Sequence, residues 1–432
     1  MGRFVYARGA LLLAPAIACM LTFAPGRAGA EPLTLPQVVE HALQNNGELK
    51  AFGEEKGIRE AGKTRAGLLP NPTLELGGGT GALTGSSAEN NLSLGVSQEF
   101  LLAGKRHKRL ALSDSELEMY RWQLADRQRL LRLEAKSAFY QAILAGQRVA
   151  LADRAVSLNR QLLDVTRERL EAGDIPELEM NLVKVELARS EGAKIETTDA
   201  LHQANTRLYT LMGLPVGESP ALEGTLEAGS ALTKTEADLK LLAQQRRPDL
   251  KALQAEKGRG EADVDLAFSE GVPNLTAGLA LTRDTTSMEI GGVEGKDTAY
   301  LIEVRLSMPI PLFDKNRSGV QEARARRSST ESRLVAAGKA IEREVAAAYA
   351  SLHNADTVLS LYRTSIIPQL EENLNLTQEA YRLGEVGILA VIQEQKNFFQ
   401  ANEGFLAALH SRQNALVKLE AASAIDLTGG MQ

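Results

Sequence analysis

The sequence is poor in cysteine and in aromatic residues, and it has no long hydrophobic run beyond its first thirty residues. One cysteine, Cys19, stands among 432 residues, and phenylalanine, tyrosine and tryptophan together make up 4%. No mature segment offers about 20 consecutive apolar residues, which excludes a helical membrane protein. Since 44% of the residues are hydrophobic, intrinsic disorder is excluded as well. Few aromatics with abundant Ala, Leu, Glu and Arg are typical of long helices.

The first thirty residues are predicted to be a signal peptide. Arg3 and Arg8 precede an apolar run, and Ala28-Gly29-Ala30 fits a cleavage site, so the mature chain is expected to begin at Glu31 and to be exported. Cleavage would remove the only cysteine, leaving no disulfide or thiolate metal site. In the alternative interpretation, Ala16-Ile17-Ala18-Cys19 is a lipobox and Cys19 is lipidated. The mature chain has 46 basic and 55 acidic residues, a net charge of −9, which argues against nucleic acid as a partner.

The mature chain contains an internal repeat, in which two copies of one unit follow each other. Leu69-Pro70-Asn71 recurs as Val272-Pro273-Asn274, and Gly173-Asp174-Ile175 aligns with Gly384-Glu385-Val386 at an offset of 211 residues. Between these landmarks, residues 97–105 align with 307–315 at an offset of 210. The repeat predicts a division into residues 31–213, a linker at 214–235 and a second copy at 236–432.

Each copy contains two segments in which apolar and polar residues alternate. These segments are predicted to be strands at about 72–79, 91–100, 273–283 and 299–310, separated by loops at 80–90 and 283–298. Strands of about nine to eleven residues cross a bilayer when tilted. The alternative is a pair of ordinary soluble hairpins, although an isolated hairpin is only marginally stable.

Very long helices follow the strands in each copy. Residues 105–172 contain no proline and only Gly146 as an internal glycine, while residues 316–383 are interrupted by Pro368, where a kink or boundary is expected. Return helices are expected over 176–212 and from 388 to about 424. Two seven-residue apolar stripes on the first long helix favour a helical barrel, in which each helix has two neighbours.

A sheet of four strands cannot close by itself, and open sheet edges are not tolerated in hydrocarbon. Three copies would supply twelve strands, enough to enclose a water-filled lumen. The predicted fold is therefore mainly α with a transmembrane β-barrel, in which a trimer forms a 12-stranded β-barrel continued by a 12-helix periplasmic α-barrel.

This layout resembles the TolC-type outer-membrane efflux channels over nearly the whole mature chain. The segment Pro309-Ile310-Pro311-Leu312-Phe313-Asp314-Lys315-Asn316 is similar to the outer-membrane components of cobalt-zinc-cadmium and nickel-cobalt efflux systems, as are Leu68-Leu69-Pro70-Asn71-Pro72 and Arg247-Pro248-Asp249-Leu250. The resemblance implies a homotrimer that crosses the outer membrane and periplasm. Its implied partners are a periplasmic adaptor and an inner-membrane pump of the resistance-nodulation-division (RND) type.

No catalytic or cofactor site is predicted. The five histidines are spread over separate helical stretches without metal-ligand spacing: His41, His107, His202, His353 and His410. Hydrolase, phosphate-binding and zinc-protease motifs are absent. The sequence therefore argues against an enzyme, a cofactor and a bound metal.

The two tight turns between long helices are the candidate functional residues. They comprise Gly173, Asp174 and Ile175 in the first copy and Gly384, Glu385, Val386 and Gly387 in the second. The resemblance implies that these tips dock the adaptor; the alternative is that they are simple hairpin turns. TolC-type channels place acidic residues just past the tips, but two of those positions hold Ala390 and Gln393 here. Glu177 and Glu179 remain as constriction candidates in the first copy, beside Gln393 in the second.

Residues at the strand ends are candidates for the membrane interface. Phe100, Tyr300 and Phe313 suit an aromatic belt, and Lys105 and Arg106 would face anionic headgroups. The alternative for the basic residues is a solvated collar. The function favoured by the sequence is a passive exit duct in the outer membrane for heavy-metal cations. The alternatives are a duct for drugs or secreted polypeptide, and a soluble periplasmic coiled-coil scaffold.

Overall fold

A computed structural model describes residues 32–83, 86–227 and 232–427 of the chain. The expected signal peptide and Cys19 lie outside the described residues. In chain order the elements are α1 (Leu35–Asn45), α2 (Gly47–Ala66), β1 (Thr73–Thr80), β2 (Asn90–Phe100), α3 (Lys105–Glu171), α4 (Glu177–Met212), α5 (Glu236–Arg246), α6 (Pro248–Glu270), β3 (Leu275–Ile290), β4 (Val293–Ser307), α7 (Arg317–Leu361), the π-helix η1 (Tyr362–Ile366), α8 (Ile367–Arg382) and α9 (Ile388–Ser423).

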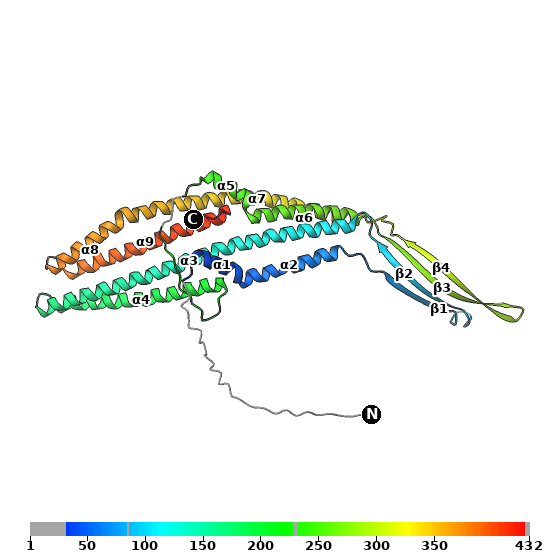
Figure 1. Cartoon of the computed structure of the whole chain (residues 1–432), viewed down its shortest axis with the longest axis horizontal. Coiled ribbons are helices and arrows are strands. Elements are labelled where there is room, and N and C mark those ends of the chain that lie inside the picture. The colour runs from blue at the N-terminus through cyan, green and yellow to red at the C-terminus, as the bar shows by residue number, and fades with distance from the viewer. Residues whose placement is uncertain (1–31, 84–85, 228–231, 428–432) are drawn as a thin grey trace, which may run out of the picture.

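The chain is elongated, with the sheet at one end and two helical hairpins at the other (Figure 1). Helix α3 runs from the sheet to the far end; its 67 residues span about 100 Å at 1.5 Å per residue. Along its length it contacts α2 and α6 near the sheet, α1 in the middle, and α4 and α9 toward the far end. A helix with neighbours on several sides agrees with the two apolar stripes in its sequence.

The second long helix is interrupted where the sequence places Pro368. Helix α7 ends at Leu361, five residues form the π-helix η1, and α8 resumes at Ile367 with the proline in its first turn. Proline lacks an N–H group and its ring opposes the preceding turn, so the ladder widens before it. The expected boundary at Pro368 is confirmed.

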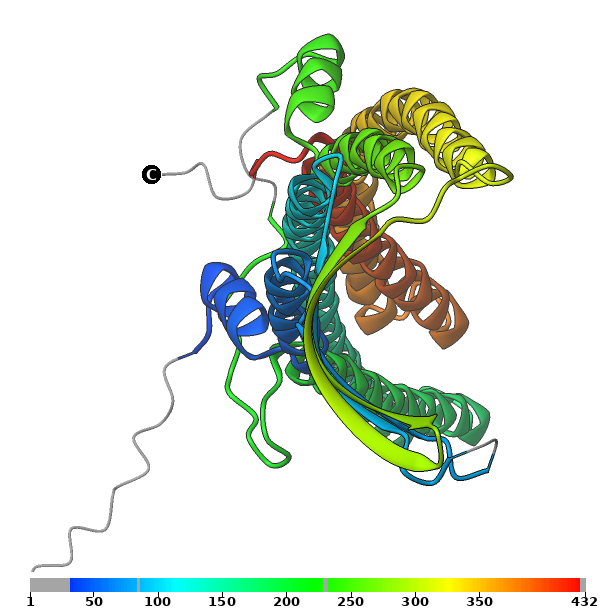
Figure 2. The same cartoon turned by 90° about the vertical axis from the view of Figure 1, so that its right-hand side faces the viewer.

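The four strands form one antiparallel sheet in the order β1-β2-β3-β4. Seen from the sheet end, they make a single curved layer (Figure 2). The second hairpin is longer than its sequence indicates, because β3 and β4 pair as far as Ile290 and Val293. Gly291 and Gly292 make the turn with φ of 64° and 84°. The prediction of a loop over residues 283–298 is therefore wrong.

That error has a physical cause. Past the apolar part of the hairpin, residues such as Arg283 and Asp284 are polar in succession and show no alternation. A paired segment with water on both sides needs no apolar face, and only an apolar face reveals a strand in sequence.

The two faces of the sheet differ in chemistry. One face is polar: Glu75 accepts a hydrogen bond from the Ser97 hydroxyl at 2.8 Å, and Arg305 lies 3.7 Å from both Glu75 and Glu303. The other face carries apolar side chains that are 49% to 76% exposed and in register across all four strands: Leu74, Leu76, Leu94, Val96, Leu279, Leu281, Ile302, Val304 and Leu306. Such a face is stable in water only when something apolar covers it.

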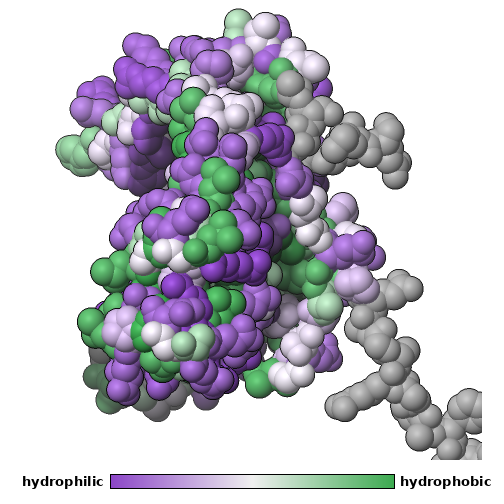
Figure 3. Space-filling model, turned by 90° about the vertical axis from the view of Figure 1, so that its left-hand side faces the viewer, coloured by the Kyte–Doolittle hydropathy of each residue, from purple (hydrophilic) through white to green (hydrophobic). Residues whose placement is uncertain are grey.

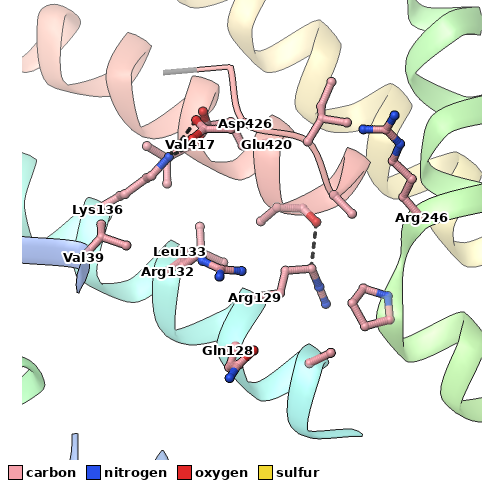
Figure 4. Close-up of a pocket in the computed structure, with 15 residues that line it drawn as sticks. Val39, Gln128, Arg129, Arg132, Leu133, Lys136, Arg246, Val417, Glu420 and Asp426 are labelled. Atoms are coloured by element: carbon pink, nitrogen blue, oxygen red, sulfur yellow. Dashed lines mark hydrogen bonds and ion pairs between the residues drawn. The ribbon is translucent and has the colours of Figure 1, made fainter. Parts of the chain in front are cut away.

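A hydrophobic core holds the middle of the molecule together. Phe139, Leu208 and Val417 are among the buried residues by which α3, α4 and α9 pack on one another. A cavity of about 450 Å³ lies beside this core, between α3, α6 and the end of α9 (Figure 4). Ion pairs in its lining join α3 to the end of α9 and the residues that follow it. Lys136 pairs with Glu420 at 2.8 Å and with Asp426 at 3.2 Å. No described helix is long and apolar enough to cross a membrane.

Candidate functional site at the helical tips

The two tips have the same backbone geometry. Gly173 and Gly384 adopt φ of 82° and 79°, the left-handed conformation that ends a helix and favours glycine. The next residue in each tip donates a backbone hydrogen bond to a carbonyl five positions earlier, from Asp174 to Arg169 at 3.0 Å and from Glu385 to Ala380 at 2.8 Å. Each tip is therefore a firmly closed turn.

Both tips expose some of the expected residues and bury others. Gly173, Asp174, Gly384, Glu385 and Gly387 are exposed at the far end of the molecule. The side chain of Ile175 is 8% exposed and Val386 is half-buried. These two apolar residues belong to the packing beneath the tips, which leaves the glycines and carboxylates as the accessible surface.

Two leucines that the sequence reasoning missed stand on the same surface. Leu178 and Leu389 are 67% and 65% exposed, and each lies five residues past the glycine of its tip. Their numbers differ by 211, the offset of the repeat, so comparing the copies at that offset finds them. The tip end shows hydrophobic residues between hydrophilic ones (Figure 3). Each tip therefore exposes one leucine near its carboxylate, Asp174 or Glu385.

Beneath the tips, Tyr381 of α8 joins the two hairpins. Its ring is 1% exposed, and its hydroxyl lies 3.4 Å from the Thr166 hydroxyl of α3 and donates to a Glu179 carboxylate oxygen of α4, also at 3.4 Å. The guanidinium of Arg169 stands over the ring, 4.7 Å from its centroid, and donates to the Tyr381 carbonyl at 2.9 Å. We call these four residues the tip clasp.

Burial raises the pKa of Tyr381, and the nearby Glu179 carboxylate adds to that rise. The phenol therefore stays protonated at neutral pH and can serve as a donor to the carboxylate. Around the clasp, α3, α4, α8 and α9 share a hydrophobic cluster that includes Leu162, Val183 and Val391. The clasp ties the second hairpin to the first just inside the tips.

The clasp includes one expected constriction residue but not the others. Glu179 lies in it, whereas Glu177 is exposed in the first turn of α4. Gln393 donates to Asn397 of its own helix at 3.0 Å and is exposed. Tyr381 itself gave no signal in the sequence, because its partners lie more than 200 residues away along the chain.

At the sheet end, the basic interface candidates have partners within the chain. Lys105 is 5% exposed and donates to the Val272 carbonyl at 2.5 Å and to the Asn274 side chain at 2.6 Å. Arg106 donates to the Gly67 carbonyl at 2.7 Å. The ammonium of Lys105 thus faces the chain, contrary to the expectation that it faces a lipid headgroup. The aromatic candidates Phe100, Tyr300 and Phe313 are exposed.

Comparison with known proteins decides the family. The family described as "Outer membrane efflux protein" matches residues 38–214 and 241–424. The chain belongs to this family. It is an outer-membrane efflux channel protein that extends into the periplasm, and not an enzyme. Within the described residues, no group of three or more His, Cys, Asp or Glu side chains could hold a metal ion.

Relatives of this family member include metal-resistance proteins. The cobalt-zinc-cadmium resistance protein CzcC of Cupriavidus metallidurans is 25% identical over 396 residues, which cover 91% of this chain and 90% of that protein. The nickel-cobalt-cadmium resistance protein NccC of Alcaligenes xylosoxydans xylosoxydans is 24% identical and covers 76% and 71%. A crystal structure of CusC superposes with a TM-score of 0.75 at 16% identity, over 98% of this chain and 99% of that chain. The expected TolC-type fold and the resemblance are confirmed.

Proposed function

We propose that three copies of this chain form a channel across the outer membrane. The observation that carries the proposal is the four-stranded sheet: the outer edges of β1 and β4 pair with no strand among the described residues. Unpaired edges are not tolerated in hydrocarbon, and twelve strands from three copies would close a barrel with a water-filled lumen. The apolar face would then lie against lipid, and the face with Glu75, Glu303 and Arg305 would line the lumen.

The helices would continue this barrel as a periplasmic tube. Its six tips, two from each copy, suit docking to a six-membered adaptor ring that leads to an inner-membrane RND pump. The exposed leucines Leu178 and Leu389 and the carboxylates Asp174 and Glu385 would form that contact. The tip clasp would hold the two hairpins of each chain together at the periplasmic mouth, with Glu179 at its edge. Cation pathways elsewhere use rings of carboxylates in this manner.

The cargo we propose is a heavy-metal cation such as cobalt, zinc, cadmium or nickel. The support comes from CzcC and NccC, which resemble this chain over most of their length. The chain would act as a passive duct, lowering the barrier to crossing the membrane while the pump supplies the energy.

Two measurements test the proposal. Outer membranes extracted in detergent should yield an assembly of three chains that resists dissociation until heated. Deletion of the gene should reduce growth on zinc, cobalt, cadmium or nickel, and the intact gene should restore it. Recovery of a soluble monomer from the periplasm would refute the channel. Sensitivity to a drug panel with unchanged metal tolerance would refute the cargo.

A further inference from the structure

A basic cavity lies where β4 passes into α7. Its volume is about 380 Å³, and it is lined by Phe268, Lys315, Arg317, Val320, Gln321 and Arg324. Three of these six residues are cationic and none is acidic. Arg317, Gln321 and Arg324 follow at helical spacings of four and three residues, which places them on one face of α7.

Several basic residues between α6 and α7 are paired with carboxylates, but in the described part of the chain the three cations of this cavity are not. Further along α7, Arg333 pairs with Glu256, and Lys257 pairs with Glu331 at 3.0 Å. Among the described residues, neither Lys315 nor Arg317 nor Arg324 forms an ion pair with a carboxylate, and Arg324 instead lies 5.1 Å above the Phe268 ring. Arg317 also stands in the first turn of α7, where the helix dipole is already positive. An anion in this cavity would reduce the repulsion among the three cations and the repulsion between Arg317 and the helix dipole.

The backbone of the cavity is firmly held. Asn316 adopts a left-handed φ of 55°; its N–H donates to Asp314 and its side chain donates to the Ala267 carbonyl, both at 2.8 Å. Gly271 lies against the same segment, since a Cβ there would sit 2.5 Å from the Lys315 carbonyl oxygen. Lys315 and Arg317 flank an anchored residue, so the backbone needs no ordering for both side chains to meet one ligand.

The two copies of the repeat use this position differently. Lys315 corresponds to Lys105 at the offset of 210, but the ammonium of Lys105 is satisfied inside the chain. Beside Lys315, the side chains of Ile310 and Leu312 are 75% and 74% exposed, and Phe313 is fully exposed. The second copy therefore combines unpaired cations with apolar side chains at one strand end, a combination typical of a membrane surface.

We propose that this cavity binds the phosphate group of an anionic phospholipid, with Ile310, Leu312 and Phe313 against its acyl chains. The inference rests on the proposed channel, which sets the ends of the strands at the membrane boundary. Charge complementarity selects phosphate, and the adjoining apolar residues select a lipid over free phosphate.

The test uses the purified full-length protein in mild detergent and native mass spectrometry of its lipid adducts. Phosphatidylglycerol, phosphatidylcholine and inorganic phosphate are titrated separately. Wild-type protein is expected to retain phosphatidylglycerol in preference to the other two. The triple variant Lys315→Gln, Arg317→Gln, Arg324→Gln is expected to bind it about a hundredfold more weakly, since each cation near an anionic surface contributes about fivefold in affinity. The control Arg326→Gln, which removes a paired arginine of the same helix, should bind as wild type does.

Three results would overturn the lipid site: equal retention of phosphatidylcholine, unchanged phosphatidylglycerol binding by the triple variant, or inorganic phosphate binding as tightly as the lipid. A heat-resistant assembly formed by the triple variant shows that a loss of binding is local and not a failure to fold. If the wild-type chain forms no such assembly, the proposed channel fails; if it assembles without lipid preference, only the lipid site fails.

Discussion

Replacing Tyr381 separates the contributions of its hydroxyl and its ring to the tip clasp. Tyr381→Phe removes only the hydroxyl, whose contacts with Thr166 and Glu179 are both 3.4 Å long. Thr166 donates its own proton to the Leu162 carbonyl, so the single phenol proton forms one hydrogen bond, to Glu179. Ordinary O–H···O bonds are 2.5–3.0 Å, so this long bond is expected to contribute about 0.5 kcal/mol, the low end of the usual range. The change leaves neither partner buried without a hydrogen bond. Thr166 still donates to the Leu162 carbonyl at 2.7 Å, and Glu179 is partly exposed to solvent. The loss of the hydroxyl therefore costs about 0.5 kcal/mol.

Tyr381→Ala removes much more. The ring is 1% exposed, and loss of a buried aromatic side chain costs about 3–5 kcal/mol. The cation–π contact with Arg169 adds about 1 kcal/mol. If the clasp restrains the opening of the periplasmic mouth, the phenylalanine variant shifts the balance toward an opened mouth about twofold. The alanine variant shifts it by at least a hundredfold.

The assay is the open probability of the purified channel in planar lipid bilayers, with Tyr362→Phe as control. Tyr362 also lies on the second hairpin, in η1, and packs against Phe405 outside the clasp. We expect the order of open probability to be alanine variant above phenylalanine variant above wild type and control. An alanine variant that opens no more often than wild type would refute the clasp. Equal effects of the two variants would mean that the hydroxyl, and not the ring, ties the hairpins together.

Three further outcomes are expected. Arg247→Ala should lower the free energy of unfolding by about 2 kcal/mol in denaturant titration. Its buried guanidinium joins the partly exposed carboxylates of Asp249 at 2.7 Å and Glu344 at 2.5 Å. An effect below about 1 kcal/mol would contradict this, and Arg247→Lys should lose less. Burial lowers the pKa of His410, and the charges of Arg148 and Lys418 lower it further. The folded state therefore loses stability relative to the unfolded state as pH falls below the unfolded pKa of about 6.5, and it keeps that stability above it. The melting temperature of His410→Gln should therefore fall less than that of wild type between pH 7.5 and 5.5, and equal falls would refute the assignment. Gly384→Asp should abolish metal resistance while trimers remain, whereas Gly384→Ala, with the same left-handed backbone and no charge, should keep it; resistance in both would argue against docking at this tip.

Local and periodic features were predictable from the sequence. The glycines at positions 173 and 384 end helices because the left-handed conformation is costly for other residues, and that requirement is visible in a single residue. The boundary at Pro368 is visible for the same reason. The apolar parts of the strands were found because a face in contact with a core or lipid must alternate in sequence.

Features that depend on pairing between distant segments were not predictable. The clasp brings Tyr381 to residues more than 200 positions earlier, and comparing the two copies with each other cannot show a contact that joins them. Lys105 was expected to face anionic headgroups because basic residues at a helix start oppose the helix dipole. Its partners, Val272 and Asn274, instead come from the other copy. In each case the missing information is which distant segment lies alongside.

The π-helix in the second long helix has a consequence for how a chain of this kind can evolve. A ring of six identical half-length subunits could in principle build the same tube, with every hairpin alike. Because η1 and Pro368 occur in one half only, the uninterrupted α3 and the interrupted α7–α8 are two distinct parts. In the proposed trimer they alternate around the ring, and only a fused gene guarantees equal numbers in strict alternation. The interruption therefore makes the ancestral duplication hard to reverse.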